Sequence, residues 1–445
     1  MTFTRIIMLA AASCLLTACE LNPFSDGDAD KKPKLVGERL DVTSGPSALA
    51  VTPGATIENF AIPAAAALDN WGQTGGNGAH APGNPAMPAS VVRAWTADIG
   101  KGDGKDAVLL NVPVVHSGRL FAIDTAGQVT ALNATTGKEL WSVDLPLKEK
   151  EQVRLGGGLA VLGDLLFITT GGGEVFALTA STGKQVWKSD LGVPLRAAPG
   201  VDGERVFVLA QDNHLFVLSA LDGALVWTHS GMEETLSLVN AATPAIANGV
   251  VVAAYTSGEI YVLRETDGRY LWHDTLSSLY SGQDPESTVS GISAEPVVAD
   301  GIVYTVGLNG GVAAYGLMNG QRFWKTPINS SQMPWVAGYQ LFVLTDKGEL
   351  ACLNRKDGAI RWVTDLNADL PKAKDGRVWS GPVLAGDRLI VASTDGYALS
   401  ITPETGKRKA ATEIDNGVGV TPIVAADGLY FQTTNGKIVA FRAGK

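Results

Sequence analysis

Cysteine is scarce in this sequence, with three residues in a chain of 445. Cys14 and Cys19 lie in the apolar N-terminal stretch, and Cys352 stands alone in an apolar run typical of a buried strand. No Cys-x-x-Cys pair and no Cys/His spacing of a metal site occurs. A disulfide within the mature chain and a cysteine-based metal centre are therefore excluded.

Charge and histidine are also sparse. Asp, Glu, Lys and Arg make up 18% of the residues, and the net charge of −10 argues against nucleic-acid binding and against a basic membrane-binding surface. The five histidines show no metal-ligand spacing. Nucleophile elbows, His-Glu-x-x-His and phosphate-binding loops are absent. The residues therefore predict no enzyme, no metal and no cofactor. They leave open one catalytic arrangement, in which two carboxylates that are distant in the sequence meet in the fold.

Long hydrophobic runs are missing as well. Ile6–Leu16 is too short to span a bilayer as a helix, and it leads into Leu16–Cys19, a Leu-Thr-Ala-Cys lipobox. We expect residues 1–18 to be a lipoprotein signal peptide and Cys19 to carry acyl chains that hold the protein on a membrane. A plain secretory signal is the alternative. Glu20, in place of Asp, favours the outer membrane over the inner one.

Residues 19–90 show no periodic pattern. Asp26–Lys34 is a polar run without an apolar face, which is typical of a disordered tether. Gly75–Pro88 has the Gly, Asn and Pro content of a loop. We therefore expect a lipidated tether and an irregular segment over residues 19–90, and a folded domain over 91–445. Whether residues 35–90 are ordered stays open.

The chain repeats itself from about residue 91 onward. Each unit holds a turn glycine, a two-residue turn such as Asn309-Gly310 or Asp395-Gly396, and the motif Gly-x-x-x-Trp. The turn dipeptides accept the positive φ of two-residue hairpins, and short apolar or alternating runs lie between them. Each unit thus predicts four short antiparallel strands.

Tryptophan is the conspicuous large residue of these units. One four-stranded sheet cannot bury both faces alone, whereas a closed ring of sheets does so. An indole buries on the order of 200 Å², so we expect the tryptophans to wedge between neighbouring sheets. In one unit Ala410 takes the place of the tryptophan while Gly406 remains. The tryptophans expected to be structural are Trp95, Trp141, Trp187, Trp227, Trp272, Trp324 and Trp362.

The first two features of the repeat occur eight times. The eighth unit ends near Arg442 without its last strand, and Val92–Trp95, at the other end, resembles the missing piece. The prediction is an all-β, eight-bladed β-propeller of four-stranded antiparallel blades, closed by an N-terminal strand that completes the last blade. Closure removes the exposed edges that an open solenoid would keep.

The Gly-Lys-x-x-x-Trp units at Gly137–Trp141 and Gly183–Trp187 resemble the repeat of the pyrroloquinoline-quinone (PQQ) propeller superfamily. Two branches of this superfamily have eight blades: the quinoprotein alcohol dehydrogenases, and the BamB-type lipoproteins of the outer-membrane β-barrel assembly machinery. The dehydrogenases are longer and typically use an adjacent cysteine pair with a calcium cluster, which this sequence lacks. The lipobox, the length and the segment Asn70–His80, similar to alphaproteobacterial members, favour the second branch.

That resemblance implies a non-catalytic scaffold, lipid-anchored at the periplasmic face of the outer membrane, that binds the POTRA domains of a BamA-type protein. It further implies contact with other subunits of the machinery and with nascent outer-membrane proteins, whose strands could add to sheet edges by β-augmentation. The rival hypotheses are a periplasmic PQQ-dependent dehydrogenase and a ligand-sensing propeller.

The resemblance also carries two partner-binding segments onto this chain. A Ser-Leu-x-Leu-Arg-like segment falls on Leu236, Ser237, Leu238 and Val239, and an Asp-x-Asp-like segment falls on Gly291 and Ser293. The two leucines match, but the arginine and both aspartates are replaced, so the charge-assisted contacts of the family pattern are absent. Binding there depends on apolar contact; alternatively, the two leucines only fill the junction between blades.

Overall fold

The computed structural model describes residues 49–55, 60–105, 107–147, 156–234, 241–276, 291–374 and 376–444. One compact unit runs from Leu49 to Lys445. The expected signal peptide, Cys19 and the segment 236–239 lie outside the described residues. The described ranges contain no helix long and apolar enough to cross a membrane.

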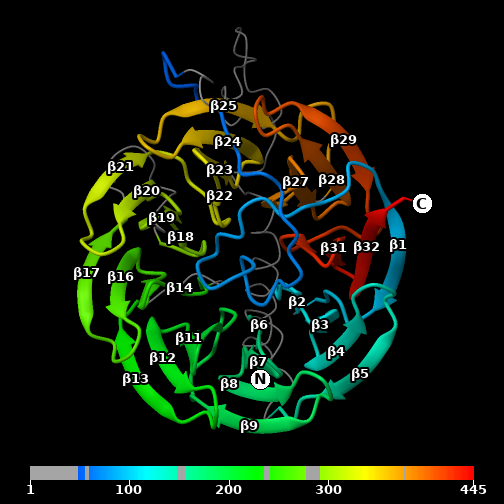
Figure 1. The fold of residues 1–445 in the computed structure, drawn as a ribbon, viewed down its shortest axis with the longest axis vertical. Coiled ribbons are helices and arrows are strands. Elements are labelled where there is room, and N and C mark those ends of the chain that lie inside the picture. The colour runs from blue at the N-terminus through cyan, green and yellow to red at the C-terminus, as the bar shows by residue number, and fades with distance from the viewer. Residues whose placement is uncertain are drawn as a thin grey trace, which may run out of the picture. The chain divides into compact units, whose positions relative to one another are not determined.

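Within these ranges, 32 strands form eight four-stranded antiparallel sheets arranged as a ring (Figure 1). Blades 1 to 4 comprise β2 (Val114–His116), β3 (Arg119–Ile123), β4 (Gln128–Asn133) and β5 (Glu139–Asp144); β6 (Gly157–Leu162), β7 (Leu165–Thr170), β8 (Glu174–Thr179) and β9 (Gln185–Asp190); β10 (Gly200–Asp202), β11 (Arg205–Leu209), β12 (His214–Ser219) and β13 (Leu225–Ser230); and β14 (Ala245–Ala247), β15 (Val250–Ala254), β16 (Glu259–Arg264) and β17 (Tyr270–Thr275).

Blades 5 to 8 complete the ring. They comprise β18 (Val297–Ala299), β19 (Ile302–Gly307), β20 (Gly311–Gly316) and β21 (Arg322–Thr326); β22 (Trp335–Ala337), β23 (Gln340–Leu344), β24 (Glu349–Asn354) and β25 (Ile360–Asp365); β26 (Trp379–Ala385), β27 (Arg388–Ser393), β28 (Tyr397–Ile401) and β29 (Arg408–Glu413); and β30 (Ile423–Ala425), β31 (Gly428–Thr433), β32 (Lys437–Ala443) and β1 (Val91–Asp98). In each blade the strands follow chain order outward, except that β1 is the outer strand of blade 8.

The ring is closed by pairing the two ends of the domain. β1 runs antiparallel to β32, from the pair Val91 and Ala443 to the pair Asp98 and Lys437, with one irregularity before Trp95. This pairing confirms the predicted closure and the count of eight blades. It also gives β32 a hydrogen-bonded strand on both sides, so that blade 8 has four strands like the other blades.

The repeated tryptophans lie on outer strands, and each stacks on a turn glycine of the next blade. A Cβ placed on Gly183 would lie 2.8 Å from the Trp141 ring, and one on Gly223 would lie 2.6 Å from the Trp187 ring. The indole N–H groups of Trp141, Trp187, Trp227, Trp272, Trp324 and Trp362 donate to the carbonyls of Ala180, Ala220, Glu265, Leu317, Arg355 and Pro403, in that order, over 2.7 to 3.1 Å.

This stacking explains why blade 7 lacks a tryptophan. Blade 8 has no turn between its third and outer strands, because the outer strand β1 comes from the other end of the domain. Blade 7 therefore has no turn glycine to stack on, and Ala410 suffices on β29. Gly406 is still needed, since it receives the indole of Trp362 from blade 6. Glycine and tryptophan of one motif thus serve two different junctions.

The junction from blade 8 to blade 1 differs in its hydrogen bonds. The carbonyl of Ala134 occupies the place of the indole acceptors elsewhere, but it receives the hydroxyl of Tyr430 and the guanidinium of Arg442, both over 2.9 Å. The Trp95 N–H has no acceptor among the described residues, while its ring packs on Tyr430 and Gly137. Packing is therefore common to all seven tryptophans, whereas the indole hydrogen bond is not.

A pair of glycines tests the stacking. Gly203 and Gly223 both have positive φ, but a Cβ on Gly203 meets nothing within 4 Å. We expect Gly203→Ala to lose about 1 kcal/mol through backbone strain alone. Gly223→Ala should lose about 2–4 kcal/mol, because the methyl also displaces Trp187. Urea unfolding midpoints measure both, and equal losses would show that the stacking contributes little.

Candidate partner-binding face and the N-terminal cap

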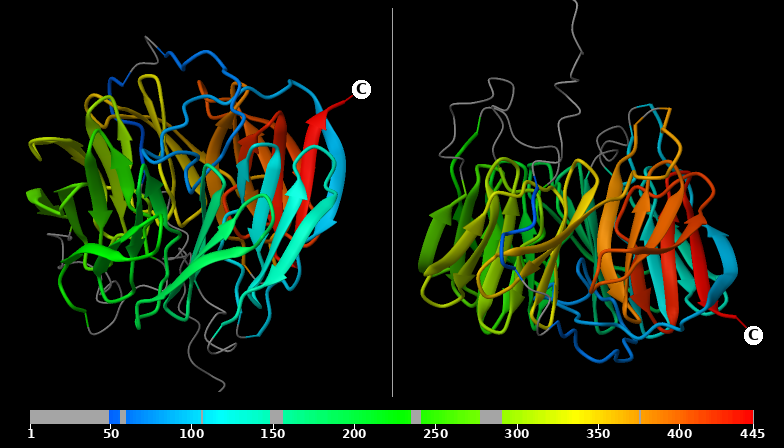
Figure 2. Two further views of the ribbon diagram at one scale, coloured as in Figure 1. Left: turned by 60° about the horizontal axis from the view of Figure 1, so that its bottom comes forward. Right: turned by 90° about the horizontal axis from the view of Figure 1, so that it is seen from above.

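The two faces of the ring differ in what covers them. One, here named the loop face, carries the connections from the outer strand of one blade to the inner strand of the next. Both predicted partner segments belong to such connections, between β13 and β14 and between β17 and β18. The opposite face carries the turns between the first and second strands of each blade. Residues 60–90, here named the cap, lie on this second face, over the centre of the ring (Figures 1 and 2).

The cap pairs with the inner strands of five successive blades. Inner strands bond to a neighbour on one side only, so their other N–H groups need partners when buried. At the same register position in blades 1 to 5, the cap supplies the acceptor. The N–H groups of Val115, Val161, Val201, Ile246 and Val298 donate to Trp71, Gly72, Gln73, Gly78 and Ala79, in that order, over 2.6 to 2.9 Å.

The other three blades bind the cap through their turns and side chains. Trp335 of blade 6 donates its indole N–H to the carbonyl of Gly83 over 3.0 Å. In blade 7 the N–H of Gly386 donates to the carbonyl of Pro85, and in blade 8 the N–H of Ala426 donates to the carbonyl of Leu68, each over 2.8 Å. The cap is therefore hydrogen-bonded to every blade of the ring.

Side-chain packing fixes the cap further. Trp71 is 1% exposed and stacks on Trp335, with ring centroids 6.2 Å apart. Gln73 is also buried, and its amide bonds both the N–H and the carbonyl of Val201. Sequence reasoning expected this stretch to be irregular and placed no contacts on it. The available signal was a lone tryptophan and histidine within a Gly- and Pro-rich stretch.

Two titratable groups lie where the cap meets blade 5. His80 is fully buried, with Nδ1 2.8 Å from the carbonyl oxygen of Pro296, and burial lowers its pKa to about 4. Glu295 is half-buried directly before Pro296, and burial raises its pKa to about 7. Burial disfavours the charged form of each group. Acid therefore destabilises the cap by protonating His80, whereas base destabilises blade 5 by ionising Glu295.

The pKa of Glu295 predicts a pH-dependent gain for Glu295→Gln. The folded pKa lies above the unfolded value of 4.5, so the wild-type chain loses stability as pH rises from about 4.5 to about 7. The variant should gain about 1–3 kcal/mol at pH 8, less than the full shift because water reaches a half-buried group. Near pH 4.5 the two proteins should be equally stable. Urea unfolding at both pH values measures this, and the same gain at each would contradict it.

The structure describes one of the two predicted partner segments. Gly291 bridges to Leu308 in the turn of blade 5, and both Gly291 and Ser293 are buried. The two residues thus present little surface, and their contact with a partner stays a prediction. Leu236, Ser237, Leu238 and Val239 lie outside the described residues.

The chain directly before that first segment, here named the stem, is held on blades 3 and 4. The Glu234 carboxylate accepts the hydroxyl of Thr256 over 2.6 Å and the amide of Asn213 over 3.3 Å. The N–H of Met232 donates to Glu259 over 2.6 Å, while the Met232 side chain is 60% exposed. These bonds hold the chain on the ring directly before that segment. The sequence analysis did not identify them.

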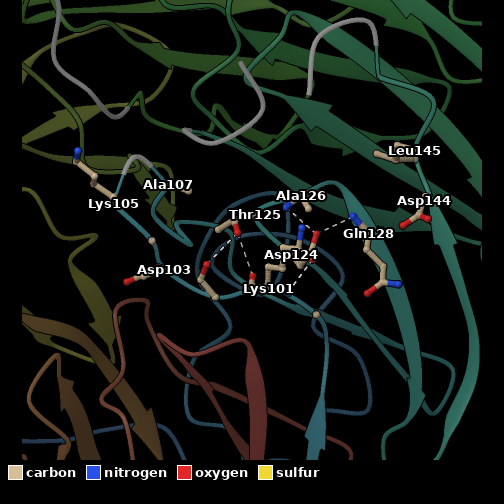
Figure 3. A pocket seen from close by; sticks show the side chains of 13 residues that line it. Lys101, Asp103, Lys105, Ala107, Asp124, Thr125, Ala126, Gln128, Asp144 and Leu145 are labelled. Carbon is tan, nitrogen blue, oxygen red and sulfur yellow. Dashed lines mark hydrogen bonds between the residues drawn. The ribbon is translucent and has the colours of Figure 1, made fainter. Parts of the chain in front are cut away.

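A hollow of about 850 Å³ lies on the loop face beside blade 1 (Figure 3). Its wall includes Lys101, Asp103, Lys105 and Asp144, and at its base the Asp124 carboxylate accepts the N–H groups of Lys101, Ala126 and Gln128. Asp124 is thus committed to holding the loop between β1 and β2. In the described part of the chain, no three His, Cys, Asp or Glu side chains form a metal site.

Cys352 provides no reactive thiol. It is fully buried in β24, and burial raises its pKa to about 12, so it stays protonated at neutral pH. This position agrees with the expectation of a small core residue.

Comparison with known proteins decides between the branches of the superfamily. The family model described as outer membrane protein assembly factor BamB matches residues 90–152 and 125–364. BamB of Escherichia coli (strain K12) is 30% identical over 350 residues, 78% of this chain and 87% of that protein. BamB of Vibrio cholerae is 31% identical over 345 residues, 77% and 86% of the two chains. The chain belongs to the BamB family.

Solved structures agree on the fold of this BamB-family chain. BamB from Moraxella catarrhalis has a TM-score of 0.66 at 20% identity, covering 80% of this chain and all of that one. A europium-containing methanol dehydrogenase has a TM-score of 0.69 at 14% identity, covering 84% and 98%. Such identities show the shared propeller alone. The sequence relatives are assembly factors, and this BamB-family chain is accordingly a non-catalytic protein.

Proposed function

We propose that this chain is a lipid-anchored scaffold of the outer-membrane β-barrel assembly machinery, and that its loop face binds the POTRA domains of a BamA-type protein. Membership of the BamB family assigns a role in outer membrane protein assembly. Docking assists the folding and insertion of outer-membrane proteins and brings the chain together with other subunits of the machinery.

The cap is the observation that favours the loop face. It is bonded to all eight blades on the opposite face, so a partner there would compete with a network of short hydrogen bonds. The loop face instead carries the stem held by Glu234 and Thr256, and the sequence that follows this stem contains two leucines. Apolar side chains on a rigid stem suit binding, because less conformational freedom is lost on association.

The length of chain after Cys19 sets how far the proposed lipid anchor lets the ring lie from the membrane. Twenty-nine residues, 20–48, separate Cys19 from Leu49, the first described residue. At about 3.3 Å per residue they can extend to roughly 100 Å. The proposed anchor therefore keeps the chain within roughly that distance of the periplasmic face of the outer membrane.

Binding of the purified POTRA region to the full soluble chain tests this proposal. Leu238→Asp should weaken binding at least tenfold, because it places a charge in an apolar contact. Leu221→Asp is the matched control: Leu221 is 81% exposed in the β12–β13 turn of the opposite face, and its replacement should leave affinity unchanged. Titration calorimetry gives both values. Absence of binding by the wild-type chain, or equal loss in both variants, would contradict the proposal.

A further inference from the structure

The outer strand of each blade leaves one edge unpaired at the rim of the ring. Such edges can pair with another chain, and natural proteins commonly protect them with charged side chains. All eight outer strands lie in the described residues, and seven of them contain Asp, Glu, Lys or Arg. β13 of blade 3, with the sequence Leu-Val-Trp-Thr-His-Ser, contains none.

β13 is also exposed and apolar. Leu225 and Val226 are 58% and 47% exposed, and Leu221, in the turn before the strand, is 81% exposed. His229 is neutral near pH 7, because burial lowers its pKa. The edge thus offers backbone donors and acceptors beside apolar side chains, and no residue of the strand itself carries a charge.

Two blades already receive a distant part of the chain on their outer side. β1 joins β32 and becomes the outer strand of blade 8. On blade 6, the Thr52 N–H donates to the carbonyl of Ile360 in β25, and the Ile360 N–H donates to the Thr52 hydroxyl, both over 2.9 Å. The backbone of an outer strand of this ring can therefore bond to another part of the chain, as Ile360 does at the start of β25.

An aromatic cluster lies beside β13, between blades 3 and 4. The ring of His229 lies 4.5 Å from that of Tyr261, and Tyr261 stacks on His273 at 5.0 Å. Tyr270, which is 50% exposed, donates to or accepts from His273 over 2.8 Å. Tyrosine is enriched at protein interfaces because its ring combines apolar area with a polar tip. These side chains add contact area next to the open edge.

We propose that the outer edge of β13 binds one extended strand of an unfolded outer-membrane barrel protein by β-augmentation. This inference rests on the proposed function and names the site for its nascent clients. A barrel strand has about ten residues that alternate between apolar and polar, and its membrane-facing residues carry no charge. It can therefore pair with β13 without placing a charge against Leu225 or Val226. The other outer strands present charged residues to the same segment.

The probe is a synthetic peptide of about ten residues with apolar and polar residues in alternation, compared with a scrambled peptide of equal composition. Hydrogen exchange of the full soluble chain should show new protection in Leu225–Ser230 with the first peptide only. Val226→Lys should weaken binding at least tenfold. Val186→Lys in β9 is the matched control, since Val186 also precedes a wedge tryptophan and is 50% exposed; it should bind like the wild type.

Three results would overturn the inference: protection on another outer strand, equal binding of both lysine variants, or equal binding of both peptides. A dimer that forms through β13 and disappears in Val226→Lys, without protection by the peptide, would instead identify a second copy as the occupant. Val226→Lys should still bind the POTRA region. Failure of the wild-type chain to bind that region would count against the proposed function, while peptide protection at β13 would stand apart from it.

Discussion

Unpaired backbone groups at strand edges are the constraint on which this structure depends. Each four-stranded blade has an inner and an outer edge, and buried N–H groups without partners are costly. The ring meets this constraint in three ways. β1 supplies the missing strand of blade 8, the cap supplies acceptors to the inner edges of blades 1 to 5, and charged residues occupy all outer strands except β13.

The same constraint makes the two faces of a repetitive ring different. Eight similar blades alone would present two equally open faces, but the single cap lies over the centre of one of them. The loop face then keeps the long connections, among them the stem at Glu234 and the hollow beside Asp124. A scaffold needs such a difference, because its partners must bind in a defined orientation. The Trp–Gly stacking between blades supplies the rigidity that holds those positions.

The fold could be predicted because the repeat carries its own physical explanation. Turn glycines, hairpin dipeptides and wedge tryptophans recur at fixed places, and even the departure at Ala410 follows from the missing turn of blade 8. The cap could not be predicted in the same way. Its contacts are mostly backbone carbonyls, such as those of Gly72 and Gly78, which leave no pattern in side-chain chemistry. The burial of Gly291 likewise depends on a bridge to Leu308, a contact that no sequence spacing indicates.

Native-state hydrogen exchange at the inner strands tests the central claim most directly. The account predicts that the N–H groups of Val115, Val161, Val201, Ile246 and Val298 are protected and exchange together, because one segment covers them all. Trp71→Ala, which removes the buried ring that stacks on Trp335, should raise the exchange of all five in parallel and leave the amides shared by β11 and β12 unchanged. Five independent rates, or rates unaffected by the substitution, would contradict the account.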